Sequence, residues 1–509
     1  MGIEALNLSK RELLNLGEQY LKIRNYDQAM TYLSRAVMQG SSQAAPRLFE
    51  LGKSFYKERK YGPALHCFQV LADKGHGGSS LLLGEIYEHG YGVMPDLQKA
   101  FDCYAAAYQS GVPQGAYQAG RMMTLDALRS EEIRDIAISW YKEAIAGGFY
   151  KAYAEIGKLY QDHGRNEEPG NPPKNDRTAL SWFLRGAVHG DNLCRELAGD
   201  AFIRGRGTEV NVKRGLELYA QAFHDGSISV CFKLGMLYDE GKAVHKNMDL
   251  SIAWYLKAYE RGDRRGKIEA GLAAYRAGRA YPAIPDGMEE KKKALAYLKQ
   301  SASLGCGIAF EALADIALSQ GRYKDFEENL KQGYRVGSEE CRKKLIRFCC
   351  GRAMKTLQAM KNFRFLHTGR RETLSTEDSE KMKEAAGWYK KAAAAGDVDS
   401  SAFLAKLYFY YGDVLGVTEK DFTKAARKGS SSSDYYVDVL LWKYYAGPGP
   451  HDGEVFHKEN PKKAFQLAQR LARKGHFKFY KIMSSYYEEG YGTKKSSTMA
   501  AYWADQVRN

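Results

Sequence analysis

Proline is scarce in this sequence, and no apolar stretch approaches the length of a membrane span. Twelve prolines among 509 residues, with 44% hydrophobic residues, describe an ordered, helix-compatible chain and exclude an intrinsically disordered one. A membrane-spanning helix requires about 20 consecutive apolar residues. The first 20 residues also lack the basic segment and following apolar run of a signal peptide. We therefore expect a cytoplasmic protein, with export by a signal-less route as the alternative.

The motifs of common catalytic and cofactor sites are also missing. The sequence contains no phosphate-binding G-x-x-x-x-G-K-[ST] loop, no H-E-x-x-H helix and no G-x-S-x-G elbow. The glycines at 205–207 follow no strand, so they do not make a dinucleotide fingerprint. His451 and His457 share one segment, but no nearby Cys or carboxylate set completes a metal site. We expect no catalytic residue, no cofactor and no metal, and hence no enzyme.

Cysteine occurs eight times but never as C-x-x-C, which gives a zinc or redox motif little support. Two pairs recur at equivalent repeat positions, 36 and 37 residues apart: Cys67 with Cys103, and Cys194 with Cys231. This spacing favours small buried fillers over disulfides between stacked helices. Adjacent Cys349 and Cys350 lie in a basic segment, where thiol pKa values could be lowered. Burial as structural cysteines is the favoured interpretation.

Glycine recurs at regular intervals, and it marks an internal repeat. Twelve glycines follow an apolar or aromatic residue by seven positions, at a base period near 36 with occasional insertions. The marked residues are Leu33, Phe68, Tyr104, Tyr141, Phe183, Tyr219, Tyr255, Leu298, Leu330, Tyr389, Phe422 and Ala468. A period of this length predicts a helical solenoid. The closing glycine suits a helix C-cap, where a positive φ is cheap only without a Cβ.

Small residues flank most of the marks at helical spacing. Alanine stands four residues before the mark at 29, 64, 100, 137, 179, 294, 385 and 464, with Gly215 and Ser251 as substitutes. It stands three residues after the mark at 36, 107, 144, 222, 258, 392 and 425. These positions share one helix face, so neighbouring helices can approach closely there.

A second glycine series lies in the helix expected before each mark. Its members are Gly17, Gly52, Gly84, Gly120, Gly157, Gly199, Gly235 and Gly271. Seven of them are followed three residues later by a bulky side chain: Tyr20, Phe55, Tyr87, Met123, Tyr160, Phe202 and Tyr238. Glycine inside a helix costs about 1 kcal/mol relative to alanine. Its recurrence indicates that close helix–helix contact offsets this cost.

These positions resemble the Sel-one-like repeat family, a relative of the tetratricopeptide repeats. The pattern A-x-x-L-G-x-x-Y-x-x-G-x-G-V, then K-A-x-x-x-Y-x-x-A, is matched best from Leu83 through Tyr87 and Gly90 to Ala100. A second good match runs from Leu234 to Tyr255. The resemblance spans nearly the whole chain and implies an α-solenoid. Family members are mostly adaptors in signalling, secretion or host interaction. The paired cysteines of the family's secreted, disulfide-bonded members are missing here.

We expect an all-α superhelix of about thirteen stacked helix-turn-helix repeats, right-handed, with the first helices lining a concave surface. Residues 1–78 form two tetratricopeptide-like hairpins, and 79–308 form regular Sel-one-like repeats. Residues 309–400 are degenerate repeats with a basic insert, and 401–509 are C-terminal Sel-one-like repeats. Inserts near 161–176, 279–290, 361–381 and 446–460 each fall between the two helices of a unit, and thus along one rim. They are either drift in tolerant loops or a partner-contacting edge.

The net charge of +15 is concentrated in the C-terminal third, where residues 341–509 hold 31 Lys/Arg against 18 Asp/Glu. Solvated helix faces are the simplest interpretation. An acidic protein partner comes next, and nucleic acid or an anionic membrane are the less favoured partners. Two phenylalanines between arginines resemble a platform for single-stranded bases. The candidate partner-binding residues are Arg342, Lys343, Lys344, Arg347, Lys361, Phe363, Arg364, Phe365, Arg370 and Arg371.

The sequence thus predicts a non-enzymatic scaffold or adaptor. Another protein, whose identity the residues do not give, would bind in the concave groove or along the rim that carries the inserts. Two alternatives stay open: a nucleic-acid-binding solenoid that uses the basic third, and a hydrolase with its site in the groove. The oligomeric state is not predicted.

Overall fold

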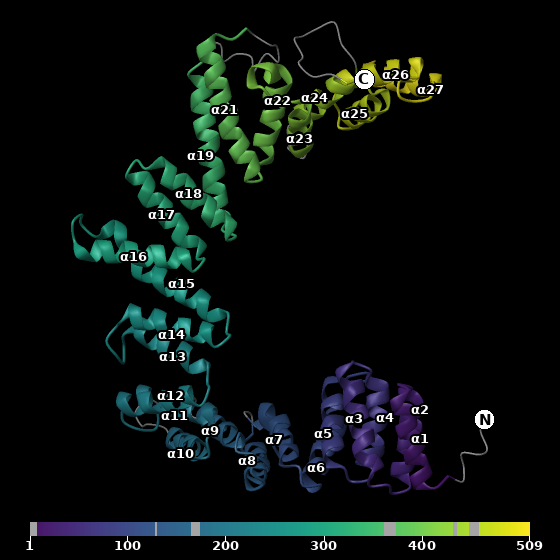
Figure 1. Ribbon diagram of the computed structural model, residues 1–509, viewed down its shortest axis with the longest axis vertical. Coiled ribbons are helices and arrows are strands. Elements are labelled where there is room, and N and C mark those ends of the chain that lie inside the picture. Colours follow the sequence, from purple (N-terminus) through teal and green to yellow (C-terminus); the bar gives the residue numbers. More distant parts are fainter. Residues whose placement is uncertain are drawn as a thin grey trace. The chain divides into compact units, whose positions relative to one another are not determined.

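The computed structural model describes residues 8–127, 130–163, 174–360, 373–430, 435–446 and 458–508, and the regular structure in these ranges is helical (Figure 1). The described helices pair in chain order into thirteen helix-turn-helix hairpins, as predicted. The first seven hairpins are α1 (Lys10–Lys22) with α2 (Tyr26–Met38), α3 (Ala44–Lys57) with α4 (Tyr61–Ala72), α5 (Gly77–His89) with α6 (Leu97–Gln109), α7 (Pro113–Ala127) with α8 (Glu131–Ala146), α9 (Ala152–His163) with α10 (Lys174–Val188), α11 (Asn192–Arg204) with α12 (Val212–His224), and α13 (Ser229–Glu240) with α14 (Met248–Glu260). The remaining six are α15 (Arg265–Gly278) with α16 (Glu289–Ser303), α17 (Gly307–Ser319) with α18 (Tyr323–Arg335), α19 (Glu339–Gln358) with α21 (Thr376–Ala394), α22 (Val398–Leu415) with α23 (Glu419–Gly429), α24 (Tyr436–Ala446) with α25 (Pro461–Arg473), and α26 (Lys478–Glu489) with α27 (Ser497–Arg508).

Polar side chains fix where many of these helices begin. Ser9 makes a capping box with Glu12 at the start of α1. Asp96, Asn211 and Asn247 each precede a second helix, and each accepts a hydrogen bond from the backbone N–H three residues later, at 3.0–3.1 Å. These bonds satisfy N–H groups that have no partner within the helix. The repeat therefore encodes the start of its second helix locally.

The core confirms the repeat register. All twelve marked residues are buried, and none is more than 5% exposed. The alanines four residues before and three residues after the marks are buried with them. Small side chains on one face of the second helix thus leave room for the helices on either side.

The closing glycines adopt the predicted left-handed conformation in eleven of twelve repeats, with φ between 78° and 99°. Gly429 is the exception, and the prediction is wrong there. It lies at the end of α23 without a positive φ, and a Cβ on it would stand 2.6 Å from the backbone N and Cα of Ala402. At this position glycine allows α23 to approach α22 closely, and it does not serve as a left-handed turn residue.

The chain divides into two compact units, residues 1–266 and 267–509. Within each unit, the second helix of one hairpin packs on the first helix of the next, as α4 does on α5 and α21 does on α22. Stacking of hairpins is therefore present in both units. The handedness of the superhelix and the domain boundaries at 78, 308 and 400 stay predictions. None of the helices in the described ranges is both long and apolar enough to cross a membrane.

The four inserts lie between the first and second helices of their hairpins, as expected. Residues 279–290 join α15 to α16 and include a short 3₁₀ turn, Tyr281–Ala283. The other inserts join α9 to α10, α19 to α21 and α24 to α25, and most of their residues lie outside the described ranges. Their predicted role as a rim that contacts a partner is not tested.

Candidate partner-binding surfaces

The first-helix glycines hold the two helices of a hairpin together. A Cβ on Gly84 would lie 2.6 Å from Cδ1 of Tyr104, the marked residue of the same hairpin, and a Cβ on Gly235 would lie 2.7 Å from the ring of Tyr255. The marked ring therefore occupies the space left by the missing side chain. Gly271 departs from the prediction, because its closest neighbours would be 3.4 Å or more away. In that hairpin Gly278, two turns later, makes the tight contact.

The marked tyrosines also carry hydroxyl groups into polar networks on the first helices. Tyr104 donates a hydrogen bond of 2.8 Å to Glu88, which accepts two more from Arg121 at 2.6 Å. These bonds tie α5, α6 and α7 together. Burial opposes ionisation of Glu88, but Arg121 and Tyr104 outweigh it and lower the pKa of the carboxyl.

An open groove lies between the first helices α11 and α13, with α12 beneath them, in the unit of residues 1–266. Its volume is about 750 Å³. Polar groups at its base are paired: Tyr219 and Lys233 both donate to Asp200, and Lys233 lies 3.4 Å from Glu196. This network fixes the floor of the groove and joins the α11–α12 hairpin to α13.

Apolar side chains are exposed along the same groove. Met236 is 52% exposed and Val210 is 64% exposed, and both line the groove with Ile203. A methionine side chain is flexible and polarisable, so it adapts to differently shaped partners. The combination of a fixed polar floor and exposed apolar walls can bury part of another molecule.

A smaller cavity of about 330 Å³ lies in the unit of residues 267–509, between α15 and the turns that lead into α17 and α19. Ile268 and Ile308 line it and are 62% and 47% exposed. Sequence patterns did not identify either groove, because each draws its residues from several consecutive elements.

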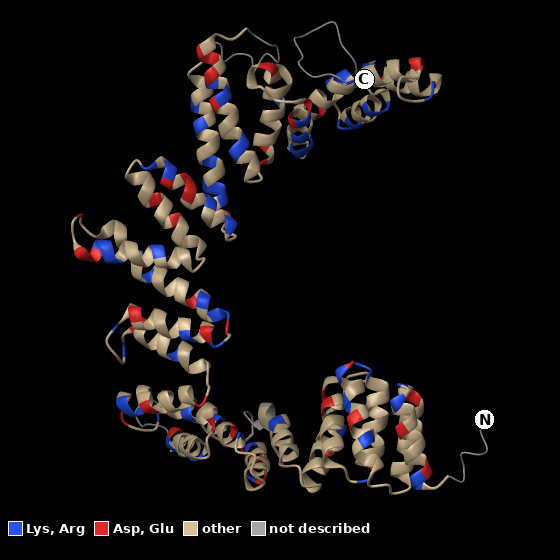
Figure 2. Cartoon of the chain, viewed as in Figure 1, with Lys and Arg blue, Asp and Glu red and all other residues tan. Residues whose placement is uncertain are grey.

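The structure describes four of the ten candidate basic-region residues, and all four lie on α19 (Figure 2). Arg342 pairs with Glu339 at 2.6 Å and donates a hydrogen bond to the carbonyl of Ala395. Lys343 pairs with Glu340, at 2.8 Å. These side chains therefore already have acidic or carbonyl partners within the protein.

The other two described candidates differ from each other. Lys344 reaches Glu311 at 2.7 Å and Asp315 at 2.8 Å on α17, so it links two hairpins. Arg347 is exposed on the same helix. The remaining six, Lys361, Phe363, Arg364, Phe365, Arg370 and Arg371, lie outside the described residues.

The described ranges give little support for reactive cysteines or for a metal site. All eight cysteines are described, and all are free thiols. Burial raises the pKa of Cys349 to about 12 and also raises the pKa of Cys350, so the alternative of lowered thiol pKa values is wrong. The part of the chain that the structure describes contains no cluster of metal-ligating side chains. His451 and His457 lie outside it.

Comparison with known proteins identifies the repeat. A family model described as Sel1 repeat matches residues 6–41, 79–112, 151–191, 193–227, 228–263, 272–306, 378–397, 398–427, 451–476 and 483–506. These ten segments together cover more than half of the chain. Most of them follow hairpins of the structure, whereas 378–397 and 451–476 each contain one described helix. The longest unmatched stretches are residues 42–78, 113–150, 307–377 and 428–450.

Among curated proteins, the chain is similar to the exopolysaccharide production negative regulator of Rhizobium leguminosarum bv. viciae, with 34% identity over 20% of this chain and 34% of that protein. It is also similar to DAP3-binding cell death enhancer 1 of Mus musculus, with 27% identity over 37% of this chain and 36% of that protein. The chain thus matches about a third of the length of each of these relatives.

Two solved structures match this chain at low similarity. A protective antigen of uropathogenic Escherichia coli with an SLR fold has 21% identity over 87% of this chain and 86% of that chain, with a TM-score of 0.36. A Sel1 repeat protein from Oxalobacter formigenes has 24% identity over 48% of this chain and 96% of that chain, with a TM-score of 0.37.

Proposed function

This chain belongs to the Sel1 repeat family, and on that premise we propose that it is a non-catalytic scaffold that binds another protein. One observation carries the proposal: the groove of about 750 Å³ between α11 and α13, in which Met236 and Val210 present exposed apolar surface beside a fully paired polar floor. A partner segment that enters this groove would bury apolar surface without breaking the ion pairs beneath it.

The names of relatives are consistent with this role. One is a negative regulator of exopolysaccharide production, another is described as DAP3-binding, and a third, in Arabidopsis thaliana, is a component of a ubiquitin-protein ligase. A fourth, in Saccharomyces cerevisiae, is a chitin synthase regulator. These names support a regulatory or assembly role in which the repeats hold a partner. These names do not identify the partner of the present chain.

The basic residues of the C-terminal third, Arg347 and the candidates at 361–371 among them, are proposed to favour an acidic partner. The balance of 31 Lys/Arg against 18 Asp/Glu over residues 341–509 supports this choice, because long-range attraction raises association rates with an oppositely charged protein.

The test compares two methionine substitutions. The wild-type protein, Met236→Glu and Met94→Glu are each used to capture binding proteins from the native cell. Met94 is 87% exposed in the turn between α5 and α6, away from the groove, so it matches the chemistry and the charge change. Because burying a methionine contributes about 1.5–3 kcal/mol, Met236→Glu should lose a partner that Met94→Glu retains. Equal capture by both variants would count against the groove, and turnover of a substrate by the purified protein would overturn the scaffold role.

A further inference from the structure

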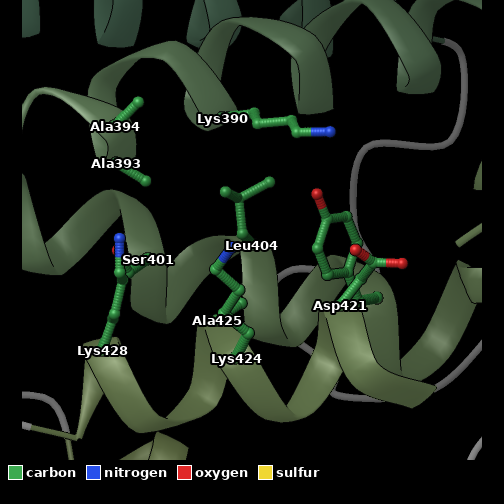
Figure 3. A pocket seen from close by; sticks show the side chains of 10 residues that line it. Lys390, Ala393, Ala394, Ser401, Leu404, Asp421, Lys424, Ala425 and Lys428 are labelled. Carbon is green, nitrogen blue, oxygen red and sulfur yellow. The ribbon is translucent and has the colours of Figure 1, made fainter. Parts of the chain in front are cut away.

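Three lysines surround a narrow cavity in the unit of residues 267–509, formed by α21, α22 and α23 (Figure 3). Its volume is about 180 Å³. Lys390 extends from α21 on one side, and Lys424 and Lys428 lie on α23 on the other side, with Leu404 of α22 between them (Figure 3). The cavity therefore has an apolar floor and a cationic rim on both sides.

Small side chains create this cavity. Ala393 and Ala394 on α21 and Ala425 on α23 line it, and larger side chains at these positions would fill it. Gly429 keeps the end of α23 against Ala402 of α22, so α23 is fixed to the floor. The space is thus part of the packed structure of three helices.

The lysines at the rim differ from other lysines of α21. Lys381 pairs with Glu377 at 2.6 Å, Lys383 with Glu380 at 2.7 Å, and Lys391 with Glu327 at 2.7 Å. Lys390 and Lys424, in contrast, make no ion pair with a described residue. The other lysines of α21 are neutralised within the protein, whereas Lys390 and Lys424 keep their charge for solvent or a ligand.

One carboxylate faces these lysines. Asp421 lines the cavity, and it accepts hydrogen bonds from the backbone N–H and hydroxyl of Thr418 at 2.9 Å and 2.7 Å. The ammonium groups of Lys390 and Lys424 against this one carboxylate leave a net positive rim. Tyr408 also lines the cavity, is 5% exposed, and has no hydrogen-bond partner among the described residues.

We propose that this cavity binds one bulky apolar side chain of an acidic peptide segment, whose flanking carboxylates pair with Lys390 and Lys424. The proposal rests on the scaffold function and names a second contact site, between α21, α22 and α23. An apolar cavity of about 150 Å³ accommodates a benzene molecule, so about 180 Å³ suits a single phenyl or branched aliphatic side chain. Because lysines lie on both sides of the cavity, they favour a peptide that carries carboxylates both before and after that side chain.

The polar groups favour a peptide over other anions. A peptide backbone supplies N–H donors for Asp421 and C=O acceptors for the hydroxyl of Tyr408. A phosphodiester backbone supplies only acceptors and would be repelled by the Asp421 carboxylate. A membrane surface would meet the rim lysines but cannot place a headgroup and an acyl chain in a cavity of one side chain.

Binding of three fluorescent peptides to the full-length protein tests this proposal. The first has eight Glu residues around one central Phe, the second replaces Phe by Ala, and the third replaces Glu by Lys. An oligothymidylate and vesicles of anionic phospholipid serve as the alternative ligands. The Glu/Phe peptide should bind best, with affinity that falls as salt is added, and the Lys peptide should not bind. Stronger binding of the oligonucleotide or the vesicles, with no preference for Phe over Ala, would overturn the proposal.

Matched variants locate the binding. Lys390→Gln and Lys424→Gln combined should weaken the Glu/Phe peptide about tenfold, at roughly threefold for each charge pair. The control is the combination Lys420→Gln and Arg427→Gln, which removes the same charge from α23 outside the cavity and should weaken binding much less. Equal loss in both double variants would show a non-specific charge effect and refute the site.

A cavity-filling variant, Ala394→Phe, keeps the charge and should abolish the preference for Phe over Ala in the peptide. Ala394 is exposed at the rim, so folding is preserved and can be checked by circular dichroism. Failure of the scaffold function would be seen as turnover of a substrate by the purified protein, whereas equal capture by Met236→Glu and Met94→Glu would count only against the groove. Failure of the present proposal would be seen as peptide binding that ignores Ala394→Phe and the lysine substitutions. The two outcomes are independent.

Discussion

Replacing Gly84 by alanine is expected to destabilise the α5–α6 hairpin, although alanine is the better helix former. Alanine gains about 1 kcal/mol over glycine inside a helix. The new Cβ, however, would lie 2.6 Å from Cδ1 and 2.9 Å from Cζ of Tyr104, where ordinary contacts begin at 3.4 Å. Overpacking of this kind costs about 1–3 kcal/mol.

The upper end of that range applies here, because the ring cannot move away cheaply. Tyr104 is 1% exposed, and its hydroxyl is held by Glu88 at 2.8 Å. A cost of about 3 kcal/mol against a gain of about 1 leaves a net loss of about 2 kcal/mol. Hairpins in a solenoid open locally, so amide hydrogen exchange in α5 and α6 is the suitable measurement. Protection there should fall about 30-fold.

Two control substitutions test whether the contact with the Tyr104 ring is the cause. Gly62, exposed near the start of α4, has no atom within 4 Å of its virtual Cβ, so Gly62→Ala should leave protection unchanged or raise it. In a Tyr104→Ala background the obstructing ring is gone, and Gly84→Ala should then stabilise the hairpin. If Gly84→Ala raises protection in the wild-type background, close contact with the ring does not explain the glycine.

Three further predictions concern charge, backbone and thiols. Arg121→Ala should lower the free energy of unfolding by about 1 kcal/mol at pH 7. Because the pKa of Glu88 is lowered in the folded state, this stabilisation is present above about pH 4.3 and lost as pH falls through the folded pKa, so urea titrations of variant and wild type should converge below that folded pKa. Gly207→Ala should lower the opening free energy of the α11–α12 hairpin, measured by hydrogen exchange, by about 2 kcal/mol, because φ is +70° and the new Cβ would collide with the carbonyl of Asp176 in α10. Unchanged exchange would contradict this. Burial raises the pKa of Cys349 to about 12, so this thiol should resist iodoacetamide at pH 8 until urea is added, and rapid alkylation of the folded protein would refute its burial. Its contribution to the free energy of unfolding should be complete below about pH 8.5 and should decline as pH rises toward 12.

The sequence could predict those features that one hairpin determines for itself. Tyr104 and its counterparts are buried as the spacing implied, because a mark, its flanking alanines and its closing glycine lie within three turns of one helix. Gly429 escaped prediction, because its neighbour Ala402 belongs to another element and the same residue type serves a turn and a close approach equally well. Gly271 and Gly278 lie two turns apart on one helix face, so periodicity could not tell which of them meets Leu298.

The candidate site was less predictable for the same physical reason. Lys344 looked like a free charge in the sequence, yet its partners Glu311 and Asp315 lie about thirty residues away on α17. Conversely, Lys390 and Lys424 carried no pattern that set them apart from neighbouring lysines. Whether a charge is neutralised depends on the facing helix, and a single sequence does not contain that pairing.

The stacking of neighbours has a mechanical consequence. Within each unit, every pair of described helices that packs extensively is adjacent along the chain or separated by one helix. If one unit were pulled from its ends, no contact between distant described hairpins of that unit would share the load. These hairpins would give way one at a time, and releasing about 36 residues at about 3.4 Å each would lengthen the unit by about 120 Å per step. Stepwise extension of this kind would leave the folded hairpins on either side intact.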